Sequence, residues 1–503
     1  MTLPVILFIL LFLHPGTAIP ENASGNKPLA ITVEDSLLLT LQNNRALRVE
    51  KINPLVRQTF EDEEQAVFDA SLSGESSVSR ERGQRVSTSG SVVENGINSS
   101  ETTLGLSRYL PTGTRIGIDA STRRLYSDLS PDQHTSRLGM TITQSLLEGR
   151  GIDVNLADLR QARLDTSISE YEFQGLLLTV IAEAEKAYWS YYLALRQVDI
   201  YRESLTLAQR QLDDTLERIA VGMLAETERT AADAEMALRN EDLINARSNL
   251  EKERLHFLRL MNPPGFTLWD RDIELLDKPD MPETDTGGGK SNYPGHDSVE
   301  SHVNLAFKMR PDLNQALLDI KKGDIEIVKT KNGLLPKLDF FLTLGKSNYS
   351  ESFSGSVDVS EDNFYDVLAG ITLELPLSAR GKEAGYRRAI LGRDQAEESL
   401  ENLKQLAELD VRTAMIEISR TREQITATAA SRKLQEEKLN IETEKYHVGR
   451  STMLLVAQAQ RDLVASRVSE AEAKVNYLKA LIELYRLDGS LLQRRGISIH
   501  AGE

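Results

Sequence analysis

Apolar residues follow a seven-residue period over long stretches of this chain. One such series comprises Tyr191, Val198, Leu205, Leu212 and Ile219. A heptad sustained this far is typical of α-helices that pack as coiled coils. Proline is absent between 131 and 263 and again after 376, so no proline breaks such helices. We therefore expect very long helices, each up to about 100 Å at a rise of ~1.5 Å per residue. Their predicted ranges are 152–220, 223–262, 380–447 and 450–488.

Between the helices, apolar and polar residues alternate, which is the pattern of a β-strand with one apolar face. The clearest apolar series are Leu338, Phe340, Leu342 and Leu344, then Ile371, Leu373, Leu375 and Leu377, and earlier Met140, Ile142 and Leu146. We expect strands over about 69–147 and about 337–377. Their length suits a membrane-spanning barrel. The alternative is a sheet half-buried against the helices.

The same order of elements occurs twice. Val221-Gly222 aligns with Val448-Gly449, where one long helix gives way to the next. Each half therefore reads as helix, strands, very long helix, Val-Gly turn and long helix, which indicates an internal duplication. The predicted organisation is repeat 1 over 19–262, an irregular Pro- and Gly-rich segment over 263–296, repeat 2 over 297–488 and a C-terminal tail over 489–503.

Composition narrows the classes of function. The apolar run Leu3–Leu13, followed by small residues, predicts a signal peptide over 1–18 and hence export. The formal net charge of −17 argues against a nucleic-acid partner, and the lack of cysteine excludes disulfides, thiolate zinc sites and a cysteine nucleophile. The seven histidines are scattered and no Gly-x-Ser-x-Gly motif occurs. We therefore expect no enzyme, no metal and no cofactor.

Taken in order, these segments resemble the TolC-like outer-membrane efflux proteins. The stretches that carry the resemblance include ITVEDSLLLTLQNNRAL, LERIAVGMLAETERTAADAE and YHVGRSTMLLVAQAQRDL. The resemblance implies a mainly α fold with membrane β-structure, in which the coiled-coil helices form a periplasmic tunnel. It also implies a homotrimer whose protomers each give four strands to a shared twelve-stranded barrel in outer-membrane lipid. The extra residues 80–136, with a turn at Pro111–Gly113, have no place in that count.

One part of this expectation also follows from the residues themselves. Two clear spanning strands per half cannot close a barrel within one chain, because the smallest barrels need eight. The barrel must therefore form between chains.

The expected function is a passive exit duct of a tripartite efflux pump or type I secretion system of a Gram-negative type of cell. The resemblance implies a periplasmic adaptor (membrane fusion) protein and an inner-membrane transporter as partners. The alternative is a surface-anchored coiled-coil structural or adhesin protein.

The Val-Gly turns are the candidate partner-binding sites. Glycine suits a helix C-terminus because it adopts the left-handed conformation readily, so these glycines also have a purely structural role as caps. The resemblance implies in addition that the turns dock the adaptor. The docking candidates are Val221, Gly222, Met223, Val448, Gly449 and Arg450.

A constriction is expected close to the same turns. Relatives often carry acidic residues in the second repeat, where this chain has Leu455 and Gln458; the first repeat offers Glu226 and Glu228. The hypothesis is therefore a hydrophobic constriction at Leu455 in place of an acidic cation-binding ring. The alternative for Leu455 is an ordinary coiled-coil core position.

Overall fold

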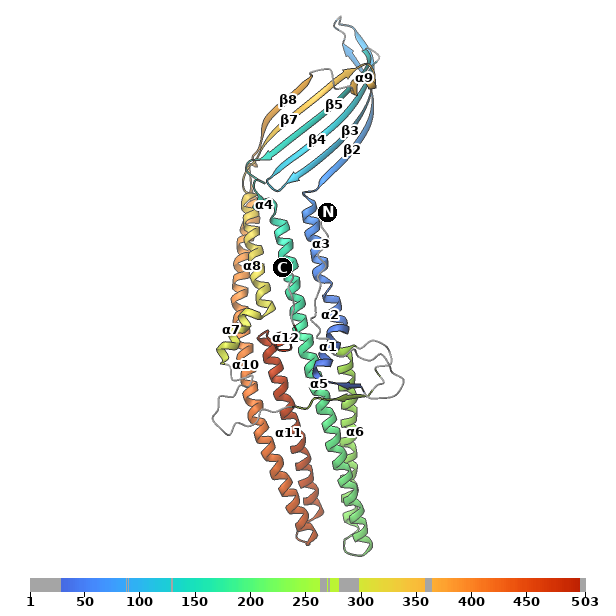
Figure 1. The fold of residues 1–503 in the computed structure, drawn as a ribbon, viewed down its shortest axis with the longest axis vertical. Coiled ribbons are helices and arrows are strands. Elements are labelled where there is room, and N and C mark those ends of the chain that lie inside the picture. Colours follow the sequence, from blue (N-terminus) through green and yellow to red (C-terminus); the bar gives the residue numbers. More distant parts are fainter. Residues whose placement is uncertain are drawn as a thin grey trace. The chain divides into compact units, whose positions relative to one another are not determined.

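The computed structural model describes residues 29–86, 88, 90–127, 130–262, 269, 272–279, 298–357 and 364–497. The predicted signal peptide and much of the predicted irregular segment lie outside them. The chain forms two compact units (Figure 1). The helical unit comprises Met1–Asn53, Glu170–Gln315 and Leu400–Glu503, and the strand unit comprises Pro54–Ser169 and Ala316–Ser399.

Four very long helices dominate the chain, which confirms the helices expected from the heptads. They are α5 (Ala157–Ala220), α6 (Thr227–Met261), α10 (Arg380–His447) and α11 (Met453–Leu487). The shorter helices are α1 (Val33–Asn43), α2 (Arg45–Glu50), α3 (Asn53–Ala66), α4 (Ile152–Asn155), α7 (Val299–Met309), α8 (Pro311–Asn332), α9 (Phe353–Val357) and α12 (Leu491–Arg494). Among the described helices, none has an apolar stretch fit to cross a bilayer.

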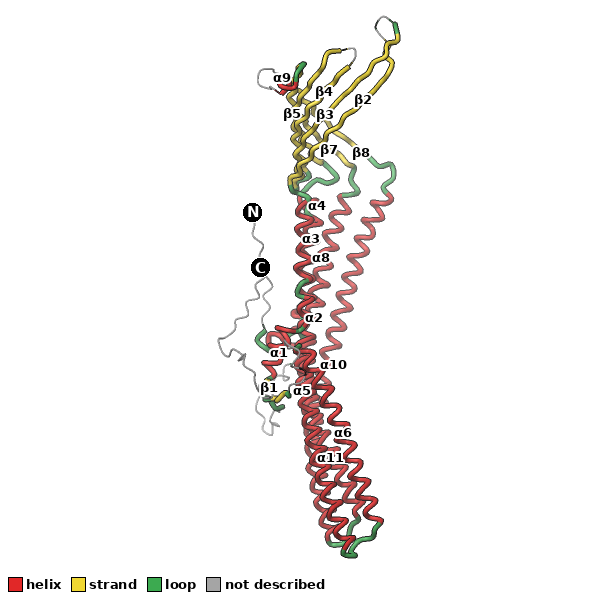
Figure 2. The backbone as a smooth tube through the Cα atoms, turned by 90° about the vertical axis from the view of Figure 1, so that its right-hand side faces the viewer, coloured by secondary structure: helices red, strands yellow, loops and turns green. Residues whose placement is uncertain are grey.

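The strand unit contains one sheet of six strands (Figure 2). In spatial order these are β2 (Ala70–Val86), β3 (Val92–Leu110), β4 (Thr114–Ser127), β5 (Ser130–Ser145), β7 (Lys337–Ser350) and β8 (Tyr365–Glu374). Every neighbouring pair is antiparallel. Strands β2 and β8 are the two edges of the sheet.

The strand count corrects the expectation of four strands per chain. Repeat 1 supplies four strands and repeat 2 supplies two, because residues 80–136 extend β2 and β5 and add β3 and β4 between them. The expected turn at Pro111–Gly113 joins β3 to β4, where Gly113 has φ of +84°.

The β3–β4 turn is anchored to the end of β5. The backbone N–H of Ser145 donates to the carbonyl of Gly113 at 3.0 Å. The Asn155 side-chain amide donates to the carbonyls of Pro111 at 3.1 Å and Gly149 at 2.8 Å. A Cβ on Gly113 would also collide with the Gly149 carbonyl, so the two turns are in close contact. The inserted hairpin is therefore an integral part of the sheet.

The sheet has one apolar and one polar face, as the alternation predicts. Register partners on the apolar face run in a row through Leu72, Leu106, Ile118, Met140, Leu344 and Val367. All six of these side chains are more than a third exposed. The short helix α9 packs on this face near one end of β5 and β7, where Ser136 contacts Ser356. The long helices leave the apolar row exposed, so the alternative of a sheet half-buried against the helices is wrong.

Small and charged residues occupy the polar face. Arg137 pairs with Asp366 at 2.7 Å and lies 3.6 Å from Asp119. Glycine at 139 and 345 makes room for these groups, because a Cβ on Gly139 would meet the Asp119 carboxylate at 2.6 Å. The charged cluster and the glycines thus depend on each other.

The core of the helical unit is centred on aromatic residues. Tyr188 is fully buried and packs edge-on against Trp189 and Phe257. Its hydroxyl donates to the carbonyl of Ile31 at 3.3 Å and accepts from the Asp277 N–H at 3.0 Å. Ile31 belongs to β1 (Leu29–Ile31), which pairs in parallel with β6 (Ile273–Leu275). A short strand therefore lies within the segment that the sequence predicts to be irregular.

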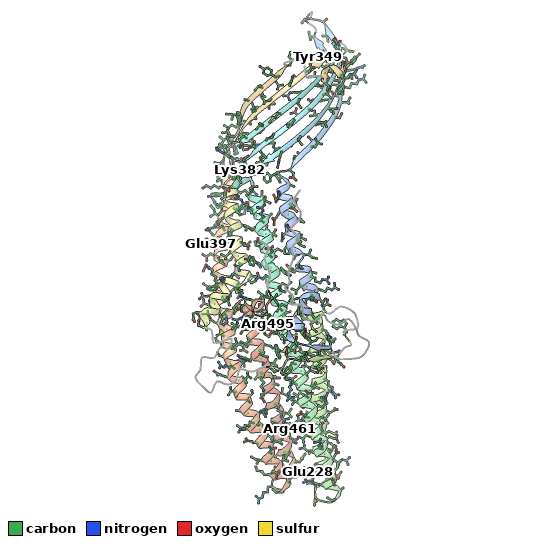
Figure 3. The ribbon with its side chains drawn as sticks, viewed as in Figure 1. Glu228, Tyr349, Lys382, Glu397, Arg461 and Arg495 are labelled. Atoms are coloured by element: carbon green, nitrogen blue, oxygen red, sulfur yellow. The ribbon has the colours of Figure 1, made fainter. Side chains whose placement is uncertain are left out.

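The C-terminal residues also belong to this core. Leu491 and Leu492 are buried. Arg495, labelled in Figure 3, pairs with Glu185, whose side chain is 2% exposed. The Arg495 Nε atom lies 3.0 Å from the second Glu185 oxygen, so the contact is bidentate. Burial raises the pKa of Glu185, while Arg495 lowers it. Residues 489–497 of the expected C-terminal tail therefore pack against α5, and we call this segment the clasp.

Breaking the Arg495–Glu185 pair should lower the stability of the folded protein by an amount that depends on pH. Replacing Arg495 with Met leaves a buried carboxylate unpaired, which costs about 3 kcal/mol at neutral pH. Since the folded-state pKa of Glu185 is raised, protonation favours the folded protein, and the defect should shrink as the pH falls. The difference in thermal midpoint between variant and wild type, followed by circular dichroism at pH 7.5 and 5, measures this effect. A Glu185→Gln/Arg495→Met double variant is the control, and a defect that is equal at both pH values would contradict the prediction.

Candidate functional site

The two Val-Gly turns have the same backbone structure. After α5, the Gly222 N–H donates to the Ile219 carbonyl at 2.9 Å and the Met223 N–H to the Arg218 carbonyl at 2.8 Å. After α10, the Gly449 N–H donates to the Tyr446 carbonyl at 3.0 Å and the Arg450 N–H to the Lys445 carbonyl at 2.7 Å. Both pairs are the two bonds of a Schellman cap, with glycine at the left-handed position. Gly222 has φ of +76° and Gly449 of +73°. The caps explain the glycines fully as structural residues.

The side chains next to the glycines carry the surface of the turns. Val221, Met223 and Val448 are all about two-thirds exposed or more. Val448 and Arg450 line a shallow groove of about 420 Å³. The other lining residues are Asn440, Ile441, Glu444 and Lys445, all on α10. The predicted docking residues of the second turn therefore lie together on one accessible surface with both apolar and charged groups.

Leu455 lies on the first turn of α11 and is 46% exposed. Thr452 caps this helix, accepting from the Leu455 N–H. The buried face of this turn is formed by Met453, Val456, Ala457, Ala459 and Gln460. Leu455 is thus not a core residue of the described chain, and Gln458 is exposed as well.

The two acidic candidates of the first repeat lie at the start of α6. Glu226 precedes the first residue of α6 and lies 3.5 Å from Arg229. Glu228 is on the first turn and half-buried (Figure 3). Neither contacts Leu455 or Gln458 in any described interaction, so the structure of one chain does not bring the four candidates together.

Two sets of contacts near the turns, which the sequence did not reveal, join the first helix pair (α5 and α6) to the second (α10 and α11). Arg218 on α5 hydrogen-bonds His447 at 3.3 Å and lies over the ring of Tyr446, both on α10. The nearly buried Glu235 on α6 contacts Arg239 at 2.6 Å and Arg461 on α11 at 2.9 Å. Only the four-residue spacing of Glu235 and Arg239 is visible in the sequence.

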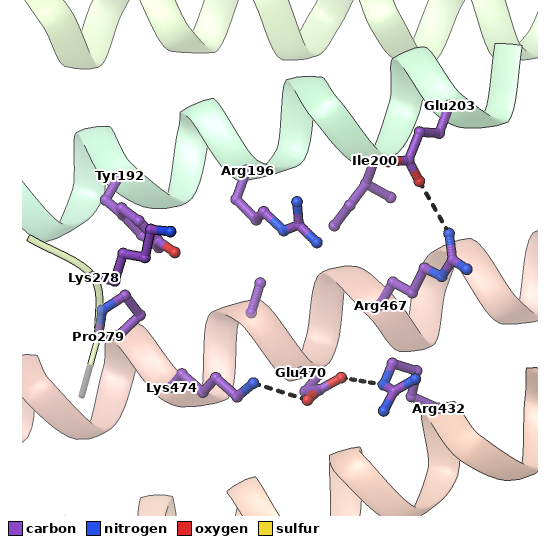
Figure 4. A pocket seen from close by; sticks show the side chains of 11 residues that line it. Tyr192, Arg196, Ile200, Glu203, Lys278, Pro279, Arg432, Arg467, Glu470 and Lys474 are labelled. Atoms are coloured by element: carbon purple, nitrogen blue, oxygen red, sulfur yellow. Dashed lines mark hydrogen bonds and ion pairs between the residues drawn. The ribbon is translucent and has the colours of Figure 1, made fainter. Parts of the chain in front are cut away.

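A pocket of about 530 Å³ lies between α5 and α11 (Figure 4). Its charged lining residues are Arg196, Glu203, Lys278, Arg432, Arg467, Glu470 and Lys474. The two carboxylates are engaged, because Glu203 pairs with Arg467 at 3.3 Å and Glu470 with Lys474 at 2.9 Å. Arg196 and Lys278 have no carboxylate partner in the described part of the chain. The pocket is therefore a cationic patch in an acidic protein.

The described residues are not arranged as a metal-binding or catalytic cluster. In the described ranges, no three His, Cys, Asp or Glu residues lie close enough together to hold a metal ion. Tyr188, Trp189 and Phe257 of the aromatic cluster are buried and form part of the packed core. What the arrangement offers is a set of surfaces: two matched turns, a groove beside one of them, and a sheet with an exposed apolar face.

Comparison with known proteins agrees with this picture. Residues 303–490 match the model of the family described as outer membrane efflux protein. The chain is 25% identical over 328 residues to outer membrane protein TolC of Escherichia coli, which covers 62% of this chain and 61% of TolC. It is 23% identical over 375 residues to TolC of Vibrio cholerae, covering 72% of this chain and 79% of that protein. The chain thus spans less than two-thirds of the Escherichia coli relative.

The fold has solved counterparts as well. The CmeC outer membrane channel of Campylobacter jejuni superposes with a TM-score of 0.65 at 15% identity, covering 91% of this chain and 86% of CmeC. Such a likeness extends over both the helices and the sheet. The order of elements, the partial family match and the fold together make the chain similar to the TolC-like outer membrane efflux proteins.

Proposed function

We propose that this protein is an outer-membrane exit duct for a tripartite efflux pump or a type I secretion system. The observation that carries the proposal is the sheet in the strand unit. Its apolar face is exposed along all six strands, its other face is polar, and its two edges are free within the chain. Such a sheet suits a wall between lipid and an aqueous lumen. The long helices then extend the duct into the periplasm.

The proposed partners follow from what one chain lacks. Six strands form an open sheet, so the working unit is a homotrimer that closes a barrel. A passive duct also needs energy from elsewhere, which an inner-membrane transporter supplies through a periplasmic adaptor. We assign adaptor docking to the two Val-Gly turns, because their caps hold exposed side chains in the same local geometry.

Electron microscopy of protein extracted from outer membranes in mild detergent tests the proposal. A hollow particle with threefold symmetry and a detergent belt around the strands supports a duct. A solid rod anchored at one end would support the alternative of a coiled-coil adhesin. A compact monomer would contradict both.

The docking assignment predicts position-specific contact with an adaptor. A photo-reactive amino acid at Val448, which is 68% exposed, should cross-link a periplasmic adaptor in living cells of the native host. Val86 is a matched control, since it is also a valine, is 71% exposed and lies at the end of β2. Mass spectrometry of the products identifies the captured protein. Equal capture from both positions, or none from 448, would remove the assignment.

The constriction hypothesis predicts a change in conductance. If Leu455 side chains meet at the narrowest point of the duct, replacing them with Ser should remove an apolar barrier and raise single-channel conductance in planar bilayers severalfold. Leu454→Ser is the matched control, because Leu454 lies on the same turn and is also exposed. An unchanged conductance in Leu455→Ser, with the trimer intact, would show that the constriction lies elsewhere.

A further inference from the structure

We infer that the barrel of this protein has eighteen strands, and that β8 of each copy pairs antiparallel with β2 of the next. The inference rests on the proposed trimeric duct and adds the number of strands, the pairing edges and their register. It departs from the twelve strands that the family resemblance implies. Three features of the sheet support it: the free edges, the inserted hairpin and the alternation of faces.

The two edge strands cannot remain unpaired in a membrane. Neither β2 nor β8 has a second partner strand in the described part of the chain. In hydrocarbon, each unpaired backbone N–H or C=O costs several kcal/mol, so spanning sheets close on themselves. Strands β2 and β8 are the two free edges of the described six-stranded sheet, so copies of the sheet pair through these two strands.

The inserted strands lie in the wall of the sheet. Strand β3 pairs with β4 from Ile97↔Ser127 to Leu110↔Thr114, and β4 continues onto β5 from Thr114↔Gln144 onwards. Removing β3 and β4 from the wall would break both ladders and the anchored turn at Gly113. Each copy therefore contributes all six strands, and three copies contribute eighteen.

The alternation of apolar and polar residues restricts the register in which β8 of one copy can pair with β2 of the next. The apolar row that begins at Leu72 on β2 ends at Val367 on β8. Because a one-residue slip turns a strand over, Val367 must face a residue of the neighbouring β2 that shares the apolar face. The available positions near the middle of β2 are Ser76, Val78 and Arg80.

Strand tilt and side-chain chemistry select Val78. In the Val78 register, the apolar row shifts by six residues along the strand direction, from Leu72 to Val78, over the six strands of one copy. A shift of one residue (~3.4 Å) for each strand spacing (~4.8 Å) corresponds to a strand tilt of about 35°. Ser76 would give about 25°, below the roughly 35–45° of known barrels. Arg80 would set a guanidinium against Val367. The Val78 register instead pairs Val367 with Val78 and Leu373 with Leu72.

A wider lumen follows from this count. Barrel diameter grows roughly linearly with strand number, so eighteen strands give a bore about one and a half times that of twelve. Glycines at 139 and 345 on the polar face leave room there for the side chains of Asp119, Arg137 and Asp366. The barrel of this protein is then wide compared with the twelve-stranded form, and its lumen carries the Arg137–Asp366 pair of every copy.

Electron cryo-microscopy of the intact protein counts the strands directly. Eighteen strands in a threefold barrel confirm the inference. Twelve strands in a threefold barrel overturn it and leave the proposed duct standing. A particle without threefold symmetry overturns both, so the two failures are distinguishable.

Cross-linking in the outer membrane tests the register independently. The native chain has no cysteine, so Val78→Cys/Val367→Cys introduces the only thiols. A short bifunctional thiol reagent should convert this variant to a covalent trimer on denaturing gels, and neither single variant should yield one. Val78→Cys/Leu373→Cys is the matched control, because its thiols are offset by about 20 Å along β8 in the inferred register. A trimer from the control pair, or none from the test pair, would overturn the register.

Discussion

In the proposed outer-membrane duct, backbone hydrogen bonding in lipid is the constraint on which the rest of the structure depends. Lipid offers no partner to an exposed N–H or C=O, so every strand of the sheet needs two neighbours. One chain provides six strands and two free edges. In the proposed duct, the same constraint requires the chain to assemble with copies of itself. It also explains why an added hairpin can enter the wall without harm: strands inserted as an antiparallel pair leave the number of free edges unchanged.

Much of the fold was predictable because it follows regular periods. The heptads from Tyr191 to Ile219 predict α5, and the alternation at Leu338–Leu344 predicts the apolar face of β7. Glycine at 222 and 449 predicts left-handed caps, and both glycines have positive φ. In each case the signal lies within a few turns or strand residues, where local geometry determines the side-chain pattern.

Contacts between distant segments were not predictable. Nothing near Arg461 in the sequence points to Glu235, and nothing near Arg495 points to Glu185, because each pair forms only when separate helices meet. The expected number of strands per chain was wrong for a different reason. The residues around Pro111–Gly113 do alternate like strands, but the family resemblance offered no position for them. The proposed docking and constriction residues act through contacts with other chains, and such contacts leave no periodic pattern within one sequence.

The two units are interleaved along the chain, and this has a consequence for biogenesis. The strand unit is complete once residue 399 has been made, whereas the helical unit needs Leu400–Glu503. Its last described residues include Leu491, Leu492 and Arg495, which close the core over Glu185. A chain that stops short of this clasp would present finished strands beside an open, apolar helical core. The helical core can therefore be completed only after the segments of the strand unit have been made.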